Sequence, residues 1–151
     1  MHKRIWLTAL LASFSTLVCA KVGNWIQTYS GQDSDGTSAS LHTEYVLSSS
    51  IRVLRGNHRQ AFIKVTYAPG VELPFSGDVE TFEIAQVEVG CSDLSWGVVT
   101  STHFTQDMKP IMAETGAYDQ SKPIWSLKGM KALDPKEPSY KTAEYICRDQ
   151  H

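Results

Sequence analysis

Apolar and polar residues alternate most clearly between residues 44 and 68, on either side of the turn-forming pair Gly56-Asn57. This alternation predicts a β-hairpin with one buried face. A two-residue loop would set apolar residues of one strand opposite polar residues of the other. A three-residue loop that also takes in His58 gathers the apolar residues on one face, and a slip of one residue would turn every side chain over. We therefore predict the pairs Leu47–Tyr67, Ser49–Val65, Ile51–Ile63 and Val53–Ala61.

A second hairpin is predicted between residues 81 and 105. Upstream in its first strand, Phe82 and Ile84 have the wrong parity for the apolar face of the hairpin. A β-bulge near Ala85-Gln86 would return both side chains to that face, which is a known effect of bulges. The predicted apolar pairs are Cys91–Leu94, Val89–Trp96 and Val87–Val98.

The remaining segments predict shorter elements. Residues 25–29 form a strand candidate, and the polar residues 30–40 a loop. A turn at residues 107–110 leads into a weaker strand at 111–113, and the proline-containing residues 117–138 are expected to be irregular.

A helix is predicted over residues 139–147, with Ser139 as its N-cap. Its apolar residues share one face at helical spacing: Tyr140, Ala143, Ile146 and Cys147. The pattern as a whole predicts an α+β fold, in which a small antiparallel sheet of about five to six strands packs against a C-terminal helix. Neither an internal repeat nor a second domain is evident.

The first 20 residues have the layout of a secretory signal peptide, with a short basic start, an apolar run too short for a good membrane span, and small residues before a cut after Ala20. Residues 1–20 are therefore predicted to be removed, leaving residues 21–151 as a single domain. Lipidation at Cys19 is an alternative that we disfavour, because Val18 fits poorly at the position before a lipidated cysteine. The mature chain should start at Lys21.

Cleavage at this site leaves two cysteines, Cys91 and Cys147, and 131 residues with a formal net charge of −4. An even cysteine count in an oxidising compartment predicts one disulfide. The disulfide would close a loop of 57 residues and contribute roughly 4 kcal/mol by the chain-entropy model. Such a mildly acidic domain is not expected to bind nucleic acid.

Catalytic and cofactor motifs are weak. No nucleophile-elbow motif occurs, and the carboxylate pairs Glu72/Asp78 and Glu80/Glu83 are interpreted as solubilising charges, so we predict a protein that is not an enzyme. Asp33, Asp35, Thr37 and Glu44 match a calcium-loop spacing only in part, and an ordinary loop is favoured. Four histidines (His42, His58, His103 and His151) lack zinc-site spacing, although His103 could meet another histidine in space. No cofactor or metal site is predicted.

The tip of the first hairpin is basic. Its cationic residues could dock an anionic partner such as a sulphated glycan or an acidic protein surface. The alternative interpretation is that the charges keep the edge of the sheet from pairing with other chains. The candidate partner-binding residues are Arg52, Arg55, His58 and Arg59.

Several short motifs occur in order: Asn24-Trp25-Ile26, Tyr45-Val46 with Ser50-Ile51, Val65-Thr66-Tyr67-Ala68-Pro69, Val87-Glu88-Val89-Gly90-Cys91, Pro123-Ile124-Trp125, and a terminal helix that ends in a cysteine. Across residues 24–147 the chain resembles the bacterial surface-adhesin E family, whose named member binds host extracellular-matrix and plasma proteins. The resemblance implies a small antiparallel sheet with the C-terminal helix joined to it by the cysteine pair. It gives no binding residue.

The resemblance, together with the signal-peptide pattern, implies an exported bacterial binding module without enzymatic activity, located in the periplasm or at the cell surface. The partners that it implies are host or envelope proteins, and the basic tip adds anionic glycans. The alternative function is that of a periplasmic enzyme inhibitor or a carrier of a small ligand such as haem or a metal ion.

Overall fold

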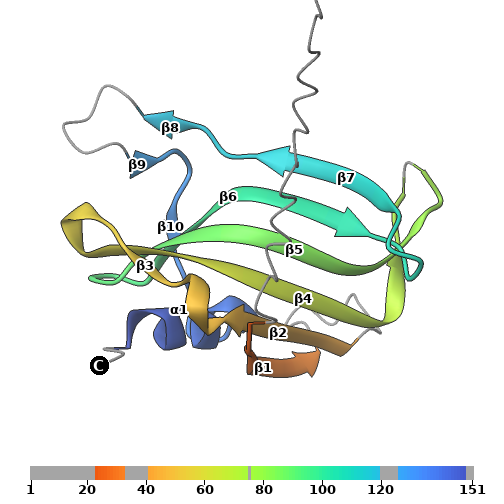
Figure 1. Ribbon diagram of the computed structural model, residues 1–151, viewed down its shortest axis with the longest axis horizontal. Coiled ribbons are helices and arrows are strands. Elements are labelled where there is room, and N and C mark those ends of the chain that lie inside the picture. Colours follow the sequence, from red (N-terminus) through yellow and green to blue (C-terminus); the bar gives the residue numbers. More distant parts are fainter. Residues whose placement is uncertain (1–22, 33–40, 75, 120–125, 149–151) are drawn as a thin grey trace, which may run out of the picture.

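A computed structural model describes residues 23–32, 41–74, 76–119 and 126–148. An eight-stranded antiparallel sheet forms most of this part of the chain (Figure 1). Its central path runs β1–β2–β4–β5–β6–β10, with β3 paired to β4 and β7 paired to β6. The strands are β1 (Trp25–Gln32), β2 (Leu41–Leu47), β3 (Arg52–Val53), β4 (His58–Glu72), β5 (Val79–Gly90), β6 (Ser95–Phe104), β7 (Pro110–Thr115) and β10 (Lys131–Ala132).

The sheet is therefore larger than the predicted five to six strands. Two of its strands, β3 and β10, contain only two residues each, which is too short for alternation to reveal. A separate two-stranded sheet is formed by β8 (Tyr118–Asp119) and β9 (Ser126–Leu127). These short strands lie in the segment 117–138 that was expected to be irregular, while residues 120–125 lie outside the described residues.

Only one face of the sheet carries the core and the helix α1 (Pro138–Cys147). We call it the helix face. Alternate residues of β2, β4 and β5 contribute small and branched side chains to it, and α1 covers them with Ala143 and Ile146, both fully buried. The sheet residues of this core are Val46, Ala61, Ile63, Val65, Ala85, Val87 and Val89.

The helix starts one residue earlier than predicted, with Pro138 in its first turn and Glu137 at the N-cap position. The prediction of Ser139 as the N-cap is wrong, because its hydroxyl donates instead to the Glu44 carboxylate at 2.9 Å. The disulfide Cys91–Cys147 joins the end of the helix to the turn after β5 and is confirmed, with a Cα–Cα distance of 5.5 Å. No helix of the described residues is long and apolar enough to cross a membrane.

The first hairpin differs from its predicted register. The observed pairs include Val46 with Ile63 and, near the tip, Val53 with Arg59, so the four predicted pairs do not form. Residues Ser48–Ser50 form a 3₁₀ turn that interrupts the strand, because serine hydroxyls compete for backbone groups: Ser50 Oγ donates to the Leu47 carbonyl at 2.6 Å. Val53 is consequently 76% exposed rather than buried.

The second hairpin confirms the pairs Val89–Trp96 and Val87–Val98. Cys91 and Leu94 lie in its turn, outside the ladder. A register shift does occur next to Gln86, but the ladder passes from Gln86–Thr100 to Val87–Val98, so the extra residue is Val99 of β6. The bulge therefore leaves the parity of β5 unchanged. The prediction that Phe82 and Ile84 return to the buried face is wrong, and both lie on the opposite face.

The other predicted strands are present and longer than expected. Strand β1 continues to Gln32, so the predicted loop at residues 30–40 begins later, and its residues 33–40 lie outside the described part. Strand β7 extends the predicted segment 111–113 to six residues.

Candidate functional site

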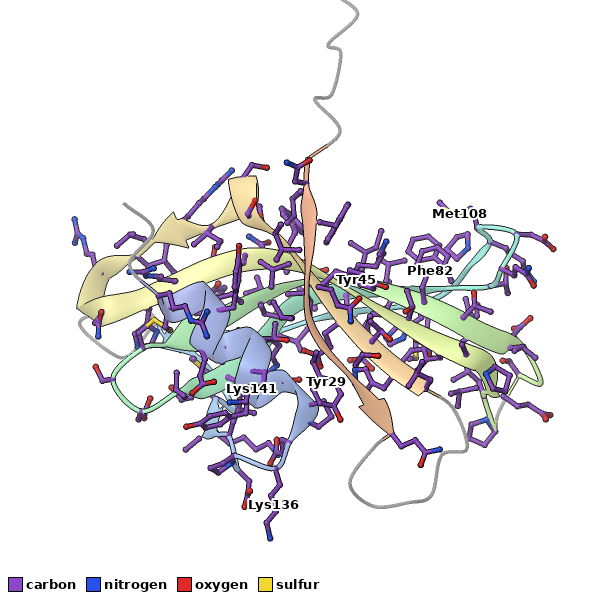
Figure 2. All side chains as sticks on the ribbon, turned by 90° about the horizontal axis from the view of Figure 1, so that it is seen from below. Tyr29, Tyr45, Phe82, Met108, Lys136 and Lys141 are labelled. Atoms are coloured by element: carbon purple, nitrogen blue, oxygen red, sulfur yellow. A yellow bond between two sulfur atoms is a disulfide. The ribbon has the colours of Figure 1, made fainter. Side chains whose placement is uncertain are left out.

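The face of the sheet opposite α1 carries aromatic and apolar side chains, and we call it the open face. Cross-strand register places them together: Tyr45 pairs with Lys64, Lys64 with Ile84, and Phe82 with Phe104. In Figure 2, Tyr45 and Phe82 lie on the upper side of the sheet, whereas Lys141 of α1 and Tyr29 lie on the lower side. The open face consists of Trp25, Tyr45, Phe62, Lys64, Phe82, Ile84 and Phe104.

Lys64 holds a central place on this face. Its Nζ lies 4.8 Å from the ring centroid of Tyr45 and 5.4 Å from that of Trp25. Cations over aromatic faces are stabilised by the negative potential of the ring. The Lys64 ammonium group therefore lies over both rings, at the centre of the aromatic side chains of the open face.

The neighbouring part of the open face is purely apolar. The rings of Phe82 and Phe104 stack with a centroid distance of 4.9 Å and an interplanar angle of 10°. Phe62 is 38% exposed, and the other members of the open face are half-buried. Contiguous exposed apolar surface on a small protein commonly marks a site of interaction, and aromatic side chains are enriched at the centre of such sites.

One end of the open face is covered by the segment that holds β8 and β9. Leu127 packs over Gly97 and Gly116, where an added Cβ would lie 2.5 Å and 2.7 Å from the leucine methyl carbons. The glycines thus permit this close approach. The cover buries Glu88, whose carboxylate accepts hydrogen bonds from the side chains of His58 (2.8 Å), Gln60 (3.3 Å) and Tyr118 (3.3 Å).

Tyr118 completes this covered end. Burial of its side chain, together with the nearby charge of Glu88, raises the pKa of the Tyr118 phenol above its usual value. The neutral hydroxyl is thereby favoured as the donor to Glu88. At this end of the sheet the open face is thus occupied by a polar network under the β8–β9 segment, and its aromatic side chains lie outside that cover.

The structure divides the four residues of the basic tip. Arg52 and Arg55 are exposed. Arg59 instead donates from Nη1 to the backbone carbonyls of Ile146 and Arg148, at 3.0 Å and 2.6 Å, and so binds the end of α1. His58 contacts Glu88. Two of the four candidate partner-binding residues therefore have contacts inside the protein, and the tip is less basic towards solvent than the sequence indicates.

The helix face holds two further groups of charged side chains. In the first, Glu44 is 1% exposed and accepts hydrogen bonds from Ser139 and Thr142 of α1, with His42 Nε2 3.1 Å from its carboxylate. Glu44 is thus satisfied by the protein itself. The other members of the partial calcium-loop spacing, Asp33, Asp35 and Thr37, lie outside the described residues.

The second group contains Glu80, Glu83 and His103, whose potential ligand atoms all lie within 4.8 Å of one another. The interpretation of Glu80 and Glu83 as solubilising charges is wrong, because their side chains are only 8% and 16% exposed. Sequence inspection misses this cluster because Glu80 and Glu83 are three residues apart on β5, and strict alternation along a strand would put them on opposite faces.

Comparisons with known proteins give likeness of fold only. No protein-family model matches the chain, and no curated protein matches it. Three solved structures of Haemophilus influenzae protein E are similar to the chain. The first is 15% identical, covers 69% of this chain and 79% of its own, and has a TM-score of 0.46; the second is 14% identical, covers 69% of this chain and 76% of its own, and has a TM-score of 0.43. A selenomethionine form is 12% identical, covers 82% of this chain and 89% of its own, and has a TM-score of 0.47. At the level of the fold they agree with the predicted surface-adhesin E resemblance; they carry nothing about the function of this chain.

Proposed function

We propose that this protein is an exported binding module without enzymatic activity, and that its open face binds a partner protein. The observation that carries the proposal is the group of aromatic side chains, from four neighbouring strands and β1, that the helix does not cover. If other elements of the fold packed on both faces of the sheet, these rings would be buried. Here α1 covers the helix face alone, so the open face retains apolar surface that a partner could bury.

The chemistry of the open face indicates the kind of partner. Phe62 and the Phe82–Phe104 stack would contact an apolar surface, and Lys64 would meet a carboxylate at its edge. Desolvation by the surrounding rings would strengthen that ion pair relative to one at an open surface. Extracellular-matrix or plasma proteins are the partners that the family resemblance suggests. A protein surface that combines apolar side chains with a carboxylate fits the open face better than a uniformly anionic glycan does.

Export is part of the same proposal. It rests on the signal-peptide pattern of residues 1–20 and on the cysteine pair Cys91–Cys147, since disulfides persist in oxidising compartments. N-terminal sequencing of protein recovered from outside the cytoplasm should start at Lys21. An acylated Cys19 would instead show that the chain is lipid-anchored, and an uncleaved N-terminus in the cytoplasm would contradict export.

Binding can be tested with the purified mature protein against an array of extracellular-matrix and plasma proteins. We expect the double variant Tyr45→Ala with Phe62→Ala to lose at least about tenfold in affinity for any protein that the parent binds, since aromatic hot-spot residues contribute about 2 kcal/mol or more. Lys64→Gln should weaken the same interaction and reduce its dependence on salt.

The matched control is Arg52→Ser with Arg55→Ser, which removes the two exposed arginines of the hairpin tip. If the open face is the binding surface, this control should bind as the parent does. The opposite result, in which only the tip variant loses affinity, would transfer binding to the tip. Self-association through the open face would appear as a dimer in sedimentation that the Tyr45/Phe62 variant lacks, and would contradict a heterologous partner.

A further inference from the structure

The cluster of Glu80, Glu83 and His103 lies on the helix face, beyond the part that α1 covers. Strand register defines its surroundings, because Glu83 pairs with His103 and His103 pairs with Met112 of β7. The two ring nitrogens of His103 face different carboxylates. Nδ1 lies 2.7 Å from Glu80 Oε1, and Nε2 lies 3.3 Å from Ser101 Oγ and 4.0 Å from Glu83 Oε1.

The charge balance of this cluster distinguishes it from the His58–Glu88 pair, in which the histidine meets one carboxylate among the described residues. At the cluster, two carboxylates share one imidazole, so a negative charge remains even when the ring is protonated. Among the described residues, no lysine or arginine forms an ion pair with Glu80 or Glu83, and the side chain of His103 is 12% exposed.

Excess negative charge in a largely buried position is costly. Either a proton or a cation can relieve this charge. A divalent cation cancels both carboxylates at once, and the imidazole nitrogen supplies the third donor.

We propose that Glu80, Glu83 and His103 form a binding site for one divalent transition-metal ion, with Zn²⁺ as the best-fitting ion. Mixed nitrogen and carboxylate donors suit Zn²⁺, whereas Ca²⁺ and Mg²⁺ prefer oxygen donors alone. Bonds of about 2.0–2.2 Å put tetrahedral donors roughly 3.3–3.6 Å apart. The donor atoms now lie within 4.8 Å of one another, with His103 Nδ1 and Glu80 Oε1 at 2.7 Å, so they must shift by about 1 Å on binding, which rotation of the glutamate side chains can provide.

Three protein donors leave the fourth position of a tetrahedral ion open to water or to an external ligand. The site would open beside β7, where Met112 is 39% exposed. The proposed metal site is separate from the open face, because Glu83 and His103 belong to the helix face of the sheet.

The test is a titration of the mature, disulfide-intact protein with ZnCl₂ after treatment with a chelator. At free Zn²⁺ of about 100 times Kd, binding to the folded state should raise Tm by about 10 °C. Glu83→Gln and His103→Gln should each weaken Zn²⁺ binding at least about tenfold. Co²⁺ in place of Zn²⁺ should give visible absorption bands with the parent that both variants lack.

Two controls keep the result specific. Glu72→Gln removes an exposed carboxylate from the end of β4, and His58→Gln removes a histidine from a different pair. Both should retain the shift in Tm that Zn²⁺ produces. An unchanged Tm for the parent, or an equal shift in the His103→Gln variant, would overturn the proposal. If His103→Gln does not fold, Glu83→Gln decides alone, because it replaces a poorly solvated charge by a neutral group of the same shape.

Discussion

Two glutamates on the helix face lie in one cross-strand row, formed by Glu44, Val65, Glu83, His103 and Met112. Glu44 lies under α1 and accepts hydrogen bonds from Ser139 and Thr142 of the helix. Glu83 lies two strands away, past the edge of the helix, where its neighbours are His103, Glu80 and Ser101.

The difference between the two positions shows that burial alone does not determine how the negative charge of a carboxylate is stabilised. Under the helix, fixed hydroxyl donors stabilise the Glu44 carboxylate without any external group. Beyond the helix, Glu83 has the Ser101 hydroxyl and the His103 ring as neighbours but also a second carboxylate, that of Glu80, so the cluster is left with an excess of negative charge. The same face of one sheet thus provides a structural polar network at one end and a candidate metal site at the other.

The largest effect should come from detaching the helix that creates this difference. Cys91→Ser combined with Cys147→Ser releases a constraint between residues 56 positions apart, and should lower the free energy of unfolding by about 4 kcal/mol. Urea unfolding measures the loss. Hydrogen exchange should show that amides of α1 lose protection first, while those of β6 beside His103 keep theirs until global unfolding. Equal loss at both ends of the row would mean that the disulfide does not act through the helix.

Removing a single donor to Glu44 should cost less. Thr142→Val preserves the shape of the side chain but deletes the hydroxyl that contacts Glu44 and, at 2.7 Å, Thr28. Leaving a buried carboxylate short of a donor should lower the free energy of unfolding by about 1–3 kcal/mol. Thr102→Val on the open face is the control and should change stability by less than about 0.5 kcal/mol. Similar values for both variants would show that Glu44 does not depend on the helix.

The last turn of the helix offers a smaller effect. Arg59→Ser removes two hydrogen bonds to the carbonyls of Ile146 and Arg148, and should lower the free energy of unfolding by about 1 kcal/mol. Arg55→Ser, at an exposed position of the same tip, should have almost no effect. The two variants, compared by chemical denaturation, separate a residue that holds the helix from one that only adds surface charge.

The smallest effect concerns the covered end of the open face. Because the pKa of Tyr118 is raised in the folded state, its stabilising contribution is complete below the pKa of the unfolded phenol, about 10, and is lost as pH rises through the folded value. Above pH 10 the stability of the parent should therefore fall more steeply than that of Tyr118→Phe. Ultraviolet absorbance of the phenolate should show one late-titrating tyrosine that the variant lacks; its absence in the parent would mean that Tyr118 is open to solvent.

Local pattern was sufficient for much of the fold. Alternation over residues 81–105 predicted the pairs Val89–Trp96 and Val87–Val98, and helical spacing predicted a C-terminal helix with Ala143 and Ile146 on its buried side. The predicted register of the first hairpin was wrong because three consecutive serines form a 3₁₀ turn within it, whereas the prediction from alternation assumes an unbroken strand. The prediction of four solvent-facing cationic residues at the basic tip was wrong in part, because the sequence does not show that Arg59 reaches the end of α1.

What the sequence alone determined is the set of strands with a half-buried pattern, the single cysteine pair and the helix that carries its second member. Only the tertiary structure decided which charged residues meet. Glu80 reaches His103 over a separation of 23 residues, and Glu44 reaches Thr142 over a separation of 98 residues. The physical reason is that side-chain parity reverses with every inserted residue, so that bulges and turns settle the face of each residue through packing and hydrogen bonding across the whole sheet.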